Sequence, residues 1–152
     1  MWYTRFVNQT SQIIIKVVNL CKSLDMDIPG KFQTLGRYGE LFAYKYFLDK
    51  GAIVVPKFLD GNLPDWDLTV DGKRVEVKAS RPSKGRYVLS FVKNKHYTSS
   101  WPKFDLALCL LIPDLDQKPI MFLLTDKDVG YKTGFGGSID YFYRKFGSKV
   151  IS

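Results

Sequence analysis

The pattern of apolar and polar positions begins with two helical segments. After Thr10 and Ser11, which are favourable residues for a helix N-terminus, apolar side chains recur every three or four positions up to residue 24. This spacing predicts a first helix. A second helix is predicted over residues 34–50, because Gly51 stands where a left-handed C-terminal cap is expected.

The remainder of the chain favours strands. Extended segments are predicted over residues 52–55, 66–70, 74–79, 87–92, 104–112 and 120–124. The segment 104–112 is nearly all apolar, which is typical of a central strand buried on both faces. Glycine-rich residues 134–137 are predicted to form a flexible loop, and residues 138–146 a short helix. The order of elements predicts an α/β (α+β) fold, a mixed β-sheet flanked by helices.

A length of 152 residues predicts a single domain with one core. We divide it into an N-terminal helical extension over about 1–33, a core over about 34–130, and a basic aromatic tail over about 131–152.

Two strictly alternating runs are separated by Asp71 and Gly72, a strong signal for a two-residue β-hairpin turn. In such a hairpin Asp67 faces Glu76, and Asp65 faces Lys78. Alternation then predicts one core face, which consists of Trp66, Leu68, Val70, Val75, Val77 and Ala79. The opposite face carries Asp65, Asp67, Glu76 and Lys78.

The chain is strongly basic. It has 23 Lys and Arg against 15 Asp and Glu, which gives a formal net charge of +8 and a pI near 9.4. Such a charge favours a polyanionic partner, either nucleic acid or an anionic membrane surface. From charge alone the two partners stay open, as does a role in solubility.

The two cysteines, Cys21 and Cys109, lie in apolar runs, and we expect buried free thiols in a reducing compartment. Neither a secretory signal nor a run long enough to span a membrane is recognisable. The sequence therefore predicts an intracellular protein, cytoplasmic or nucleoid-associated.

The predicted pairing of Asp67 with Glu76 brings two carboxylates together, which is unfavourable unless something neutralises them. Hard oxygen ligands beside Lys78 are typical of a site for Mg²⁺, with Mn²⁺ as a possible substitute. Such a metal activates water and stabilises charge on a phosphate, and the ammonium assists. The alternative is a solvated hairpin face with ordinary surface ion pairs.

At this point the residues resemble a known pattern. The run 64–70 (PDWDLTV) followed by 75–78 (VEVK) is similar to the signature of the PD-(D/E)xK nucleases, which include restriction endonucleases, Holliday-junction resolvases and some homing endonucleases. Upstream, Gly39 and Glu40 on a helix that ends before Gly51 also fit. The resemblance covers about residues 36–80, and it implies a restriction endonuclease-like fold.

The resemblance implies a role for each matching residue. Glu40 would be the acidic helix residue that supports the metal site, Glu76 the second carboxylate and Lys78 the catalytic lysine. The motif aspartate would be Asp67 or Asp65. We favour Asp67 because it precedes alternating apolar residues, whereas Asp65 directly follows the proline of the literal signature.

Several polar residues downstream of the hairpin are candidates for DNA contact: Ser80, Arg81, Lys84, Arg86, Lys93 and Lys95. A merely solvated loop stays open as the alternative. His96, the one histidine, is expected to be an ordinary surface residue, and Trp101 a core residue. Because cutting both strands of a duplex favours two active sites, we also expect a homodimer or a higher homo-oligomer.

These observations lead to three hypotheses. The first is a Mg²⁺-dependent DNA endonuclease, either sequence-specific (restriction or homing) or structure-specific (junction-resolving). The second is a nucleic-acid-binding module of the same fold that does not cleave. The third is a repair exonuclease or an RNA-cleaving enzyme of this fold.

Overall fold

The structure is a computed structural model that describes residues 2–27, 34–59, 66–91, 104–130 and 134–152, with side chains described from residue 11 onward. The helices are α1 (Trp2–Ser23), α2 (Leu35–Asp49), α3 (Asp126–Val129) and α4 (Ile139–Phe146). The strands are β1 (Val54–Pro56), β2 (Leu68–Val70), β3 (Lys73–Ser80), β4 (Tyr87–Ser90), β5 (Leu106–Leu111), β6 (Ile120–Thr125), β7 (Gly134–Gly137) and β8 (Val150–Ile151). The 3-10 turns η1 (Lys57–Leu59) and η2 (Gly147–Lys149) complete the set.

Six strands form one sheet in the order β1-β2-β3-β5-β6-β8. The pair β3–β5 is parallel, and the other neighbouring pairs are antiparallel. Strands β4 and β7 pair antiparallel with each other and form a separate two-stranded sheet, which we call the β4–β7 ribbon. The predicted class, a mixed sheet flanked by helices, is confirmed.

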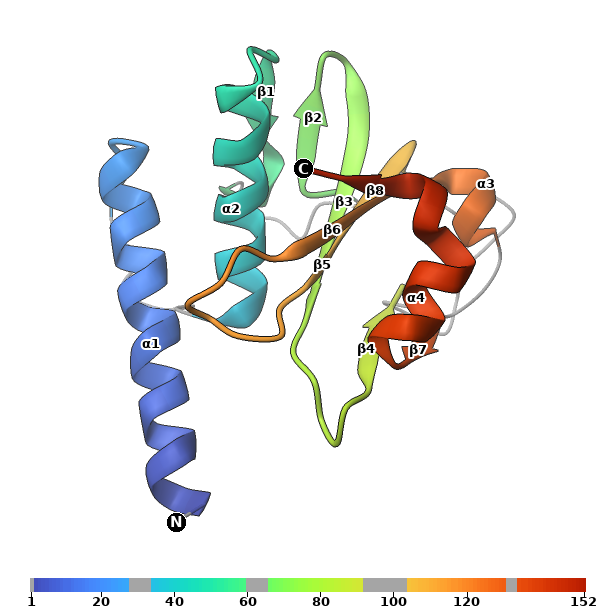
Figure 1. The fold of residues 1–152 in the computed structure, drawn as a ribbon. Coiled ribbons are helices and arrows are strands. Elements are labelled where there is room, and N and C mark those ends of the chain that lie inside the picture. Colours follow the sequence, from blue (N-terminus) through green and yellow to red (C-terminus); the bar gives the residue numbers. More distant parts are fainter. Residues whose placement is uncertain (1, 28–33, 60–65, 92–103, 131–133) are drawn as a thin grey trace, which may run out of the picture.

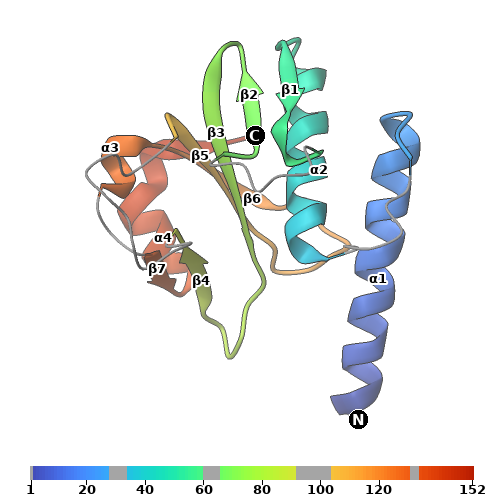
Figure 2. The same ribbon diagram turned by 180° about the vertical axis from the view of Figure 1, so that it is seen from behind.

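The elements are stacked in three layers (Figures 1 and 2). Helices α1 and α2 lie side by side on one face of the six-stranded sheet, and α4 with the β4–β7 ribbon lies on the other. The N-terminal turns of α1 extend past the rest of the protein in both views. None of the described helices combines the length and apolar character needed to cross a membrane.

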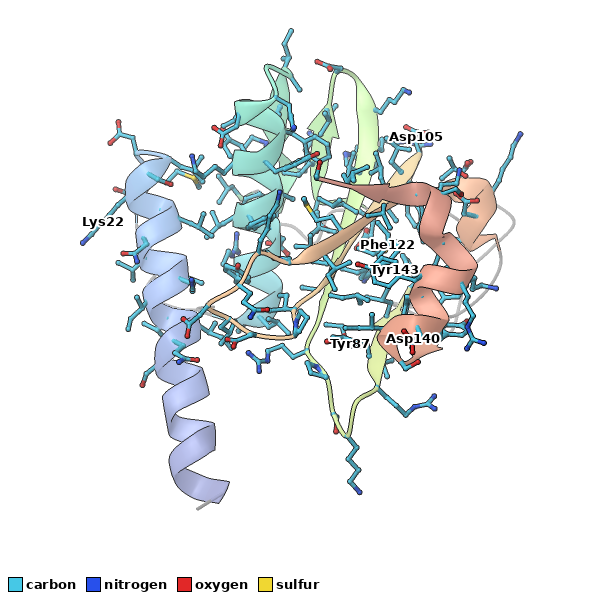
Figure 3. All side chains as sticks on the ribbon, viewed as in Figure 1. Lys22, Tyr87, Asp105, Phe122, Asp140 and Tyr143 are labelled. Atoms are coloured by element: carbon cyan, nitrogen blue, oxygen red, sulfur yellow. The ribbon has the colours of Figure 1, made fainter. Side chains whose placement is uncertain are left out.

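Each face of the sheet has its own hydrophobic cluster. The first cluster, between the sheet and α1–α2, includes Leu41, Leu68, Val75, Leu108 and Leu110. The second cluster, between the sheet and α4, is rich in aromatic rings such as Phe91, Phe122, Phe135, Phe142 and Phe146. Figure 3 shows Phe122 and Tyr143 in this second space, and their ring centroids are 5.7 Å apart. The central strand β5 is covered on both faces, as predicted.

Local signals in the sequence explain the α2 and hairpin boundaries. The Thr34 side chain accepts a hydrogen bond from the Arg37 amide and so caps the N-terminus of α2. The turn residues Asp71 and Gly72 have φ angles of 49° and 84°, the left-handed values that a two-residue hairpin turn of type I′ requires. Pairing of Val70 with Lys73 and of Leu68 with Val75 follows the predicted register.

Two predictions about local structure are wrong. Helix α1 begins at Trp2 and not after Ser11, because no Gly or Pro precedes the Thr10–Ser11 signal to end a helix there. The glycine-rich residues 134–137 form strand β7 and not a flexible loop. Their pairing with β4 satisfies the backbone groups that glycine exposes. The segment predicted as a tail thus contributes β7, α4 and β8 to the folded body.

Candidate active site

Strand β3 separates its side chains between the two clusters by simple alternation. Val75 and Val77 belong to the first cluster, under α2. Glu76 and Lys78 lie on the opposite face, beside Ala107 and Cys109, their register partners on β5. Around Glu76 and Lys78 the opposite face of the hairpin is therefore covered by the second cluster.

The buried Glu76 forms an ion pair with the partly buried Lys78. The Lys78 Nζ lies 3.3 Å from the Glu76 Oε1, and the side chains are 19% and 4% exposed, respectively. The Lys78 ammonium also lies 5.8 Å from the centroid of the Phe91 ring. Burial raises the pKa of the neighbouring Cys109 thiol to about 12, an effect that Lys78 partly offsets. Because the Glu76 side chain is only 4% exposed and the Lys78 side chain 19%, the alternative of a solvated hairpin face does not hold for these two residues.

Asp67 is held by the backbone of β3. Its amide donates to the Val75 carbonyl at 2.9 Å, and its Oδ2 accepts a hydrogen bond of 2.7 Å from the Val77 amide. Because Val75 is also the register partner of Leu68, two residues of one strand stand opposite one residue of the other, the arrangement of a β-bulge. The regular pairing of Asp67 with Glu76 is therefore wrong. Asp67 instead bonds to the β3 backbone on both sides of Glu76, through its amide at Val75 and its buried carboxylate at Val77.

The bulge also corrects the predicted position of Trp66. Regular alternation placed Trp66 with Leu68 on the first face, but the extra residue reverses the alternation upstream of it. Trp66 packs against the second cluster, its Nε1 donates to the Thr69 hydroxyl at 3.2 Å, and the Arg74 guanidinium lies 5.7 Å from its ring. Asp65, the second candidate for the motif aspartate, lies outside the described residues.

Gly39 brings helix α2 very close to β3. A Cβ atom at Gly39 would lie 2.9 Å from the Cβ of Ala79 and 3.7 Å from Val77, so only glycine fits without a shift. The neighbouring residue, Glu40, is thereby held near the stretch of β3 that follows Glu76. The Glu40 Oε2 lies 3.5 Å from an Arg37 guanidinium nitrogen.

Arg37 is a residue that the sequence reasoning missed. Its guanidinium lies 5.0 Å from the Phe58 ring, and the Phe58 amide donates to the carbonyl of Asp67 at 2.9 Å. Arg37 therefore links Glu40 with the segment that carries Asp67. The spacing of three residues between Arg37 and Glu40 on a predicted helix was the available signal.

The described carboxylates do not form a complete metal cage. Within the described ranges, no group of three or more His, Cys, Asp or Glu side chains is placed to hold a metal ion together. The site thus contains the buried carboxylates of Asp67 and Glu76 and the ammonium of Lys78. They lie next to the β3 backbone and the aromatic rings of the second cluster.

The candidate DNA-contact residues fall in different environments. Ser80 is 6% exposed, and its hydroxyl accepts a hydrogen bond from the Val88 amide at 3.0 Å, so it ties β4 to β3. Lys84 and Arg86 are exposed on the turn before β4, and Arg81 is half-buried beside it. The candidates Lys93 and Lys95, together with His96 and Trp101, lie outside the described residues.

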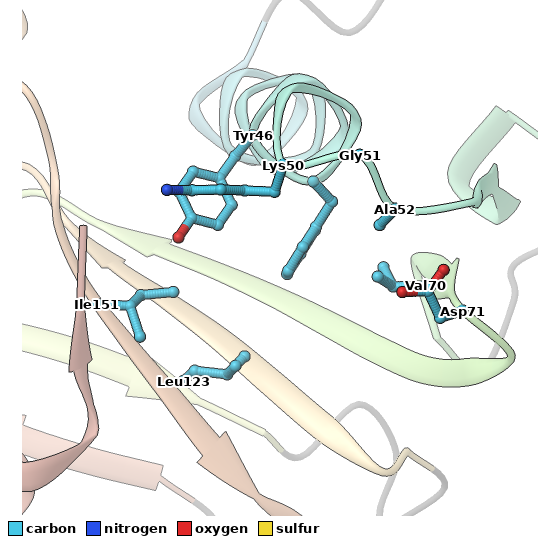
Figure 4. A pocket seen from close by; sticks show the side chains of 9 residues that line it. Tyr46, Lys50, Gly51, Ala52, Val70, Asp71, Leu123 and Ile151 are labelled. Atoms are coloured by element: carbon cyan, nitrogen blue, oxygen red, sulfur yellow. The ribbon is translucent and has the colours of Figure 1, made fainter.

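A cavity of about 350 Å³ opens elsewhere, at the C-terminal end of α2 (Figure 4). Tyr46, Lys50, Val70, Leu123 and Ile151 contribute to its walls, and none of the predicted site residues lines it. Its polar groups serve the fold, since the Tyr46 hydroxyl donates to the carbonyl of the last residue at 2.9 Å. This cavity is therefore separate from the carboxylates on β3.

Comparisons with known proteins show the fold. No protein-family model matches the sequence, and no curated protein sequence matches it either. Among solved structures, the chain is similar to a bacterial homing endonuclease, I-Ssp6803I, with a TM-score of 0.52 and 20% sequence identity. The similarity covers 72% of this chain and 77% of that chain. The chain thus shares the fold of that endonuclease over most of its length.

Proposed function

We propose that this protein is a metal-dependent endonuclease that hydrolyses phosphodiester bonds of DNA. The observation that carries the proposal is the buried Glu76–Lys78 pair beside Asp67, on the strand and in the order typical of the PD-(D/E)xK signature. A buried ion pair contributes little to stability compared with apolar residues of the same size. Its retention in the interior therefore favours a chemical role. The endonuclease fold and the charge of +8 support a DNA substrate.

The donor set suits Mg²⁺ better than a metal that needs a closed protein cage. Mg²⁺ is usually held by one or two carboxylates, with water and substrate phosphate completing its shell. Asp67 and Glu76 supply two buried carboxylates, whose oxygens are the ligands that Mg²⁺ prefers. We propose these two as ligands of Mg²⁺ or Mn²⁺, with Asp65 and Glu40 as further candidates. The metal, when bound, would polarise the phosphate and lower the pKa of a water.

The protein's own residues hold this chemistry in place. The Val77 amide fixes the orientation of the Asp67 carboxylate, since one of its oxygens is engaged at 2.7 Å. The Lys78 ammonium, held by Glu76 and the Phe91 ring, is positioned to neutralise charge on a phosphate oxygen or to orient the attacking water. The Glu40–Arg37 pair supports the site from α2.

We further propose that the substrate is a DNA duplex of a specific sequence. The structural neighbour is a homing endonuclease, which favours a sequence-specific duplex over a branched junction. A homodimer, or a higher homo-oligomer, would supply one active site for each strand. A module that binds nucleic acid without cleaving it is an outcome of the test below.

The test compares the wild type with a variant that removes both charges of the pair, Glu76→Gln with Lys78→Met. Because neutral residues of similar size replace a buried pair, this variant should fold as well as the wild type. With supercoiled plasmid and a four-way junction in MgCl₂, MnCl₂ or EDTA, we expect cleavage by the wild type only with metal. Cleavage by the variant should be slower by about 10²–10³-fold or more.

Lys73→Met is the matched control, since Lys73 is exposed on the same strand. It should cleave like the wild type. DNA binding without cleavage by the wild type would leave the binding module as the function. Full cleavage by the double variant would remove Glu76 and Lys78 from the chemistry.

A further inference from the structure

The β4–β7 ribbon has one buried face and one open face. Tyr87, Leu89 and Phe135 point inward and are 1–4% exposed. On the outward face Val88 is 65% exposed and pairs with Gly136, which is also exposed. Along this part of β7 the outward face therefore has no side chain, and a large apolar residue stands open beside it.

The fold explains two of the three β7 glycines. A Cβ atom at Gly134 would overlap the Leu89 carbonyl oxygen, and one at Gly137 would lie 2.6 Å from the Tyr141 ring. At Gly136 the nearest atoms would be 3.7 Å away, which is an ordinary contact, and its φ is not positive. Gly136 thus lacks the internal packing reason that its neighbours have. Glycine in a strand also occurs where a ligand or another backbone approaches closely.

A rigid basic turn precedes the ribbon. The backbones of Ser83 and Arg86 exchange hydrogen bonds of 2.9 and 3.0 Å, and the residues between them, Lys84 and Gly85, have φ angles of 51° and 74°. This is the two-residue turn that matches the twist of paired strands. The Arg86 guanidinium lies over Gly136, since one of its nitrogens is 3.7 Å from the place of a Gly136 Cβ. The turn therefore places the positive charge of Arg86 next to Gly136.

The charged residues in the sequence around β4 are all basic. In the turn before β4, Lys84 and Arg86 are exposed and Arg81 is half-buried, and residues 77–104 of the sequence contain no Asp or Glu. A surface with this charge is complementary to a phosphate backbone and not to an acidic or mixed protein surface. A two-stranded ribbon also has the dimensions that the major groove of B-form DNA admits.

We infer that the outward face of the β4–β7 ribbon, formed by Arg86, Val88, Ser90 and Gly136, docks against duplex DNA. Gly136 lets the backbone approach the duplex, Val88 makes the apolar contact, and Arg86 with the neighbouring Lys84 contacts phosphate. This inference rests on the proposed function and names the surface that would hold its substrate. The inner face of the ribbon carries Phe135, whose ring packs on Phe91 with centroids 6.1 Å apart. Phe91 in turn contacts Lys78, so the docking surface backs directly onto the proposed catalytic lysine.

The first experiment adds a side chain at Gly136, on the outward face of β7. Gly136→Ala and Gly136→Val are compared with Gly147→Ala, a control at an exposed glycine with open space around it. Binding to a fluorescent 30-base-pair duplex of mixed sequence is measured in EDTA. We expect the dissociation constant to rise by about tenfold for Gly136→Val, less for Gly136→Ala, and not at all for the control. Thermal stability should be equal to or above that of the wild type, because valine favours strands.

A structural role for Gly136 predicts the opposite, a loss of stability in both variants. Binding of the wild-type strength by stable Gly136→Val would overturn the inference.

The second experiment does not depend on how well the glycine variants fold. Both natural cysteines are at most 1% exposed, so the exposed thiol that Val88→Cys introduces should react with maleimide faster than either of them. We expect saturating duplex to slow its labelling by maleimide by about tenfold or more. Ile53→Cys, at a position that is 78% exposed before β1, is the control and should label at the same rate with and without DNA. Equal labelling of Val88→Cys in both conditions would overturn the inference.

Failure of this inference is distinguishable from failure of the proposed function. If the wild type cleaves DNA and loses cleavage in the Glu76–Lys78 double variant, the proposed function holds whatever the ribbon variants do. Normal binding by those variants would then remove only the ribbon. If the wild type neither binds nor cleaves DNA, both proposals are wrong.

Discussion

On the α1–α2 side of the sheet, β3 presents Val75 and Val77 to a helix that Gly39 allows to come within van der Waals contact. On the other side the same strand presents Glu76 and Lys78 to aromatic rings. Both faces of β3 are covered, yet the strand presents only apolar side chains to α2 at Val75 and Val77, whereas its other face contains a charged pair. The difference teaches that burial by itself does not locate the structural core. The buried face with charges is the one on which chemistry is to be sought.

The largest expected effect comes from removing one charge of the Glu76–Lys78 pair on the second face. Lys78→Met leaves the Glu76 carboxylate buried without its ammonium, which should destabilise the protein by about 3 kcal/mol or more. The double variant Glu76→Gln with Lys78→Met should recover most of that loss, because no charge is then left unpaired. Chemical denaturation of the three proteins measures the effect. Equal stability of the single variant and the wild type would show that the pair is open to water.

On the first face, the corresponding change is a steric clash between α2 and β3. Gly39→Val places side-chain atoms where Ala79 already stands, and overpacking of this kind costs about 1–3 kcal/mol. Gly36→Ala, on the exposed side of the same helix, is the control and should raise stability, since alanine is the better helix former. Urea unfolding of both variants gives the values. A stable Gly39→Val would mean that α2 can move away from β3.

The two cysteines report on the two faces without any added probe. Cys21 lies on α1 in the first cluster, whereas Cys109 lies on the central strand β5 in the second cluster. Burial raises the pKa of both thiols, for Cys109 to about 12. We expect labelling of Cys109 to be slower than labelling of Cys21 by about tenfold or more, because opening a central strand costs more than releasing an outer helix. Single Cys→Ala variants separate the two rates. Faster labelling of Cys109 would contradict the stability assigned to the second face.

The smallest effect is an acid sensitivity at the edge of the second face. Although burial raises the pKa of Asp128, hydrogen bonds from the amide and hydroxyl of Thr125 and from Lys149 lower it below 3.8 overall. A carboxyl whose pKa is lower in the folded state stabilises it above the unfolded pKa, and this contribution is lost as the pH falls through the folded value. Asp128→Asn should therefore flatten the fall in melting temperature below about pH 4. Parallel curves for both proteins would contradict this assignment.

Local signals were sufficient for much of the fold. The Thr34 cap predicted the start of α2, and the Asp71–Gly72 turn predicted the hairpin register down to the pair of Leu68 with Val75. Each of these depends on residues close together in the chain, and each has a known steric or hydrogen-bonding reason. The positions of Glu76 and Lys78 on one face followed from that register.

The sequence could not predict what depends on distant partners. The bulge at Asp67 arises from competition between a side chain and a backbone carbonyl for the Val77 amide, and alternation alone gives no sign of it. Strand β7 was missed because glycine disfavours strands, while its pairing with β4 comes from a segment more than forty residues upstream. The covering of the second face was missed for the same reason, since α4 and the ribbon are remote from β3 in sequence.

The pairing of β3 with β5 has a consequence for the order of folding. Among the strands that the structure describes it is the one parallel pairing, and it joins residues about thirty positions apart, such as Glu76 and Ala107. Hairpins close in microseconds, whereas pairings that must first close a long loop form later. We therefore expect the β2–β3 hairpin to form early and the β3–β5 contact late in refolding. The surroundings of Lys78 would then be among the last parts to assemble, so that the proposed nuclease activity would appear only once the chain is fully folded.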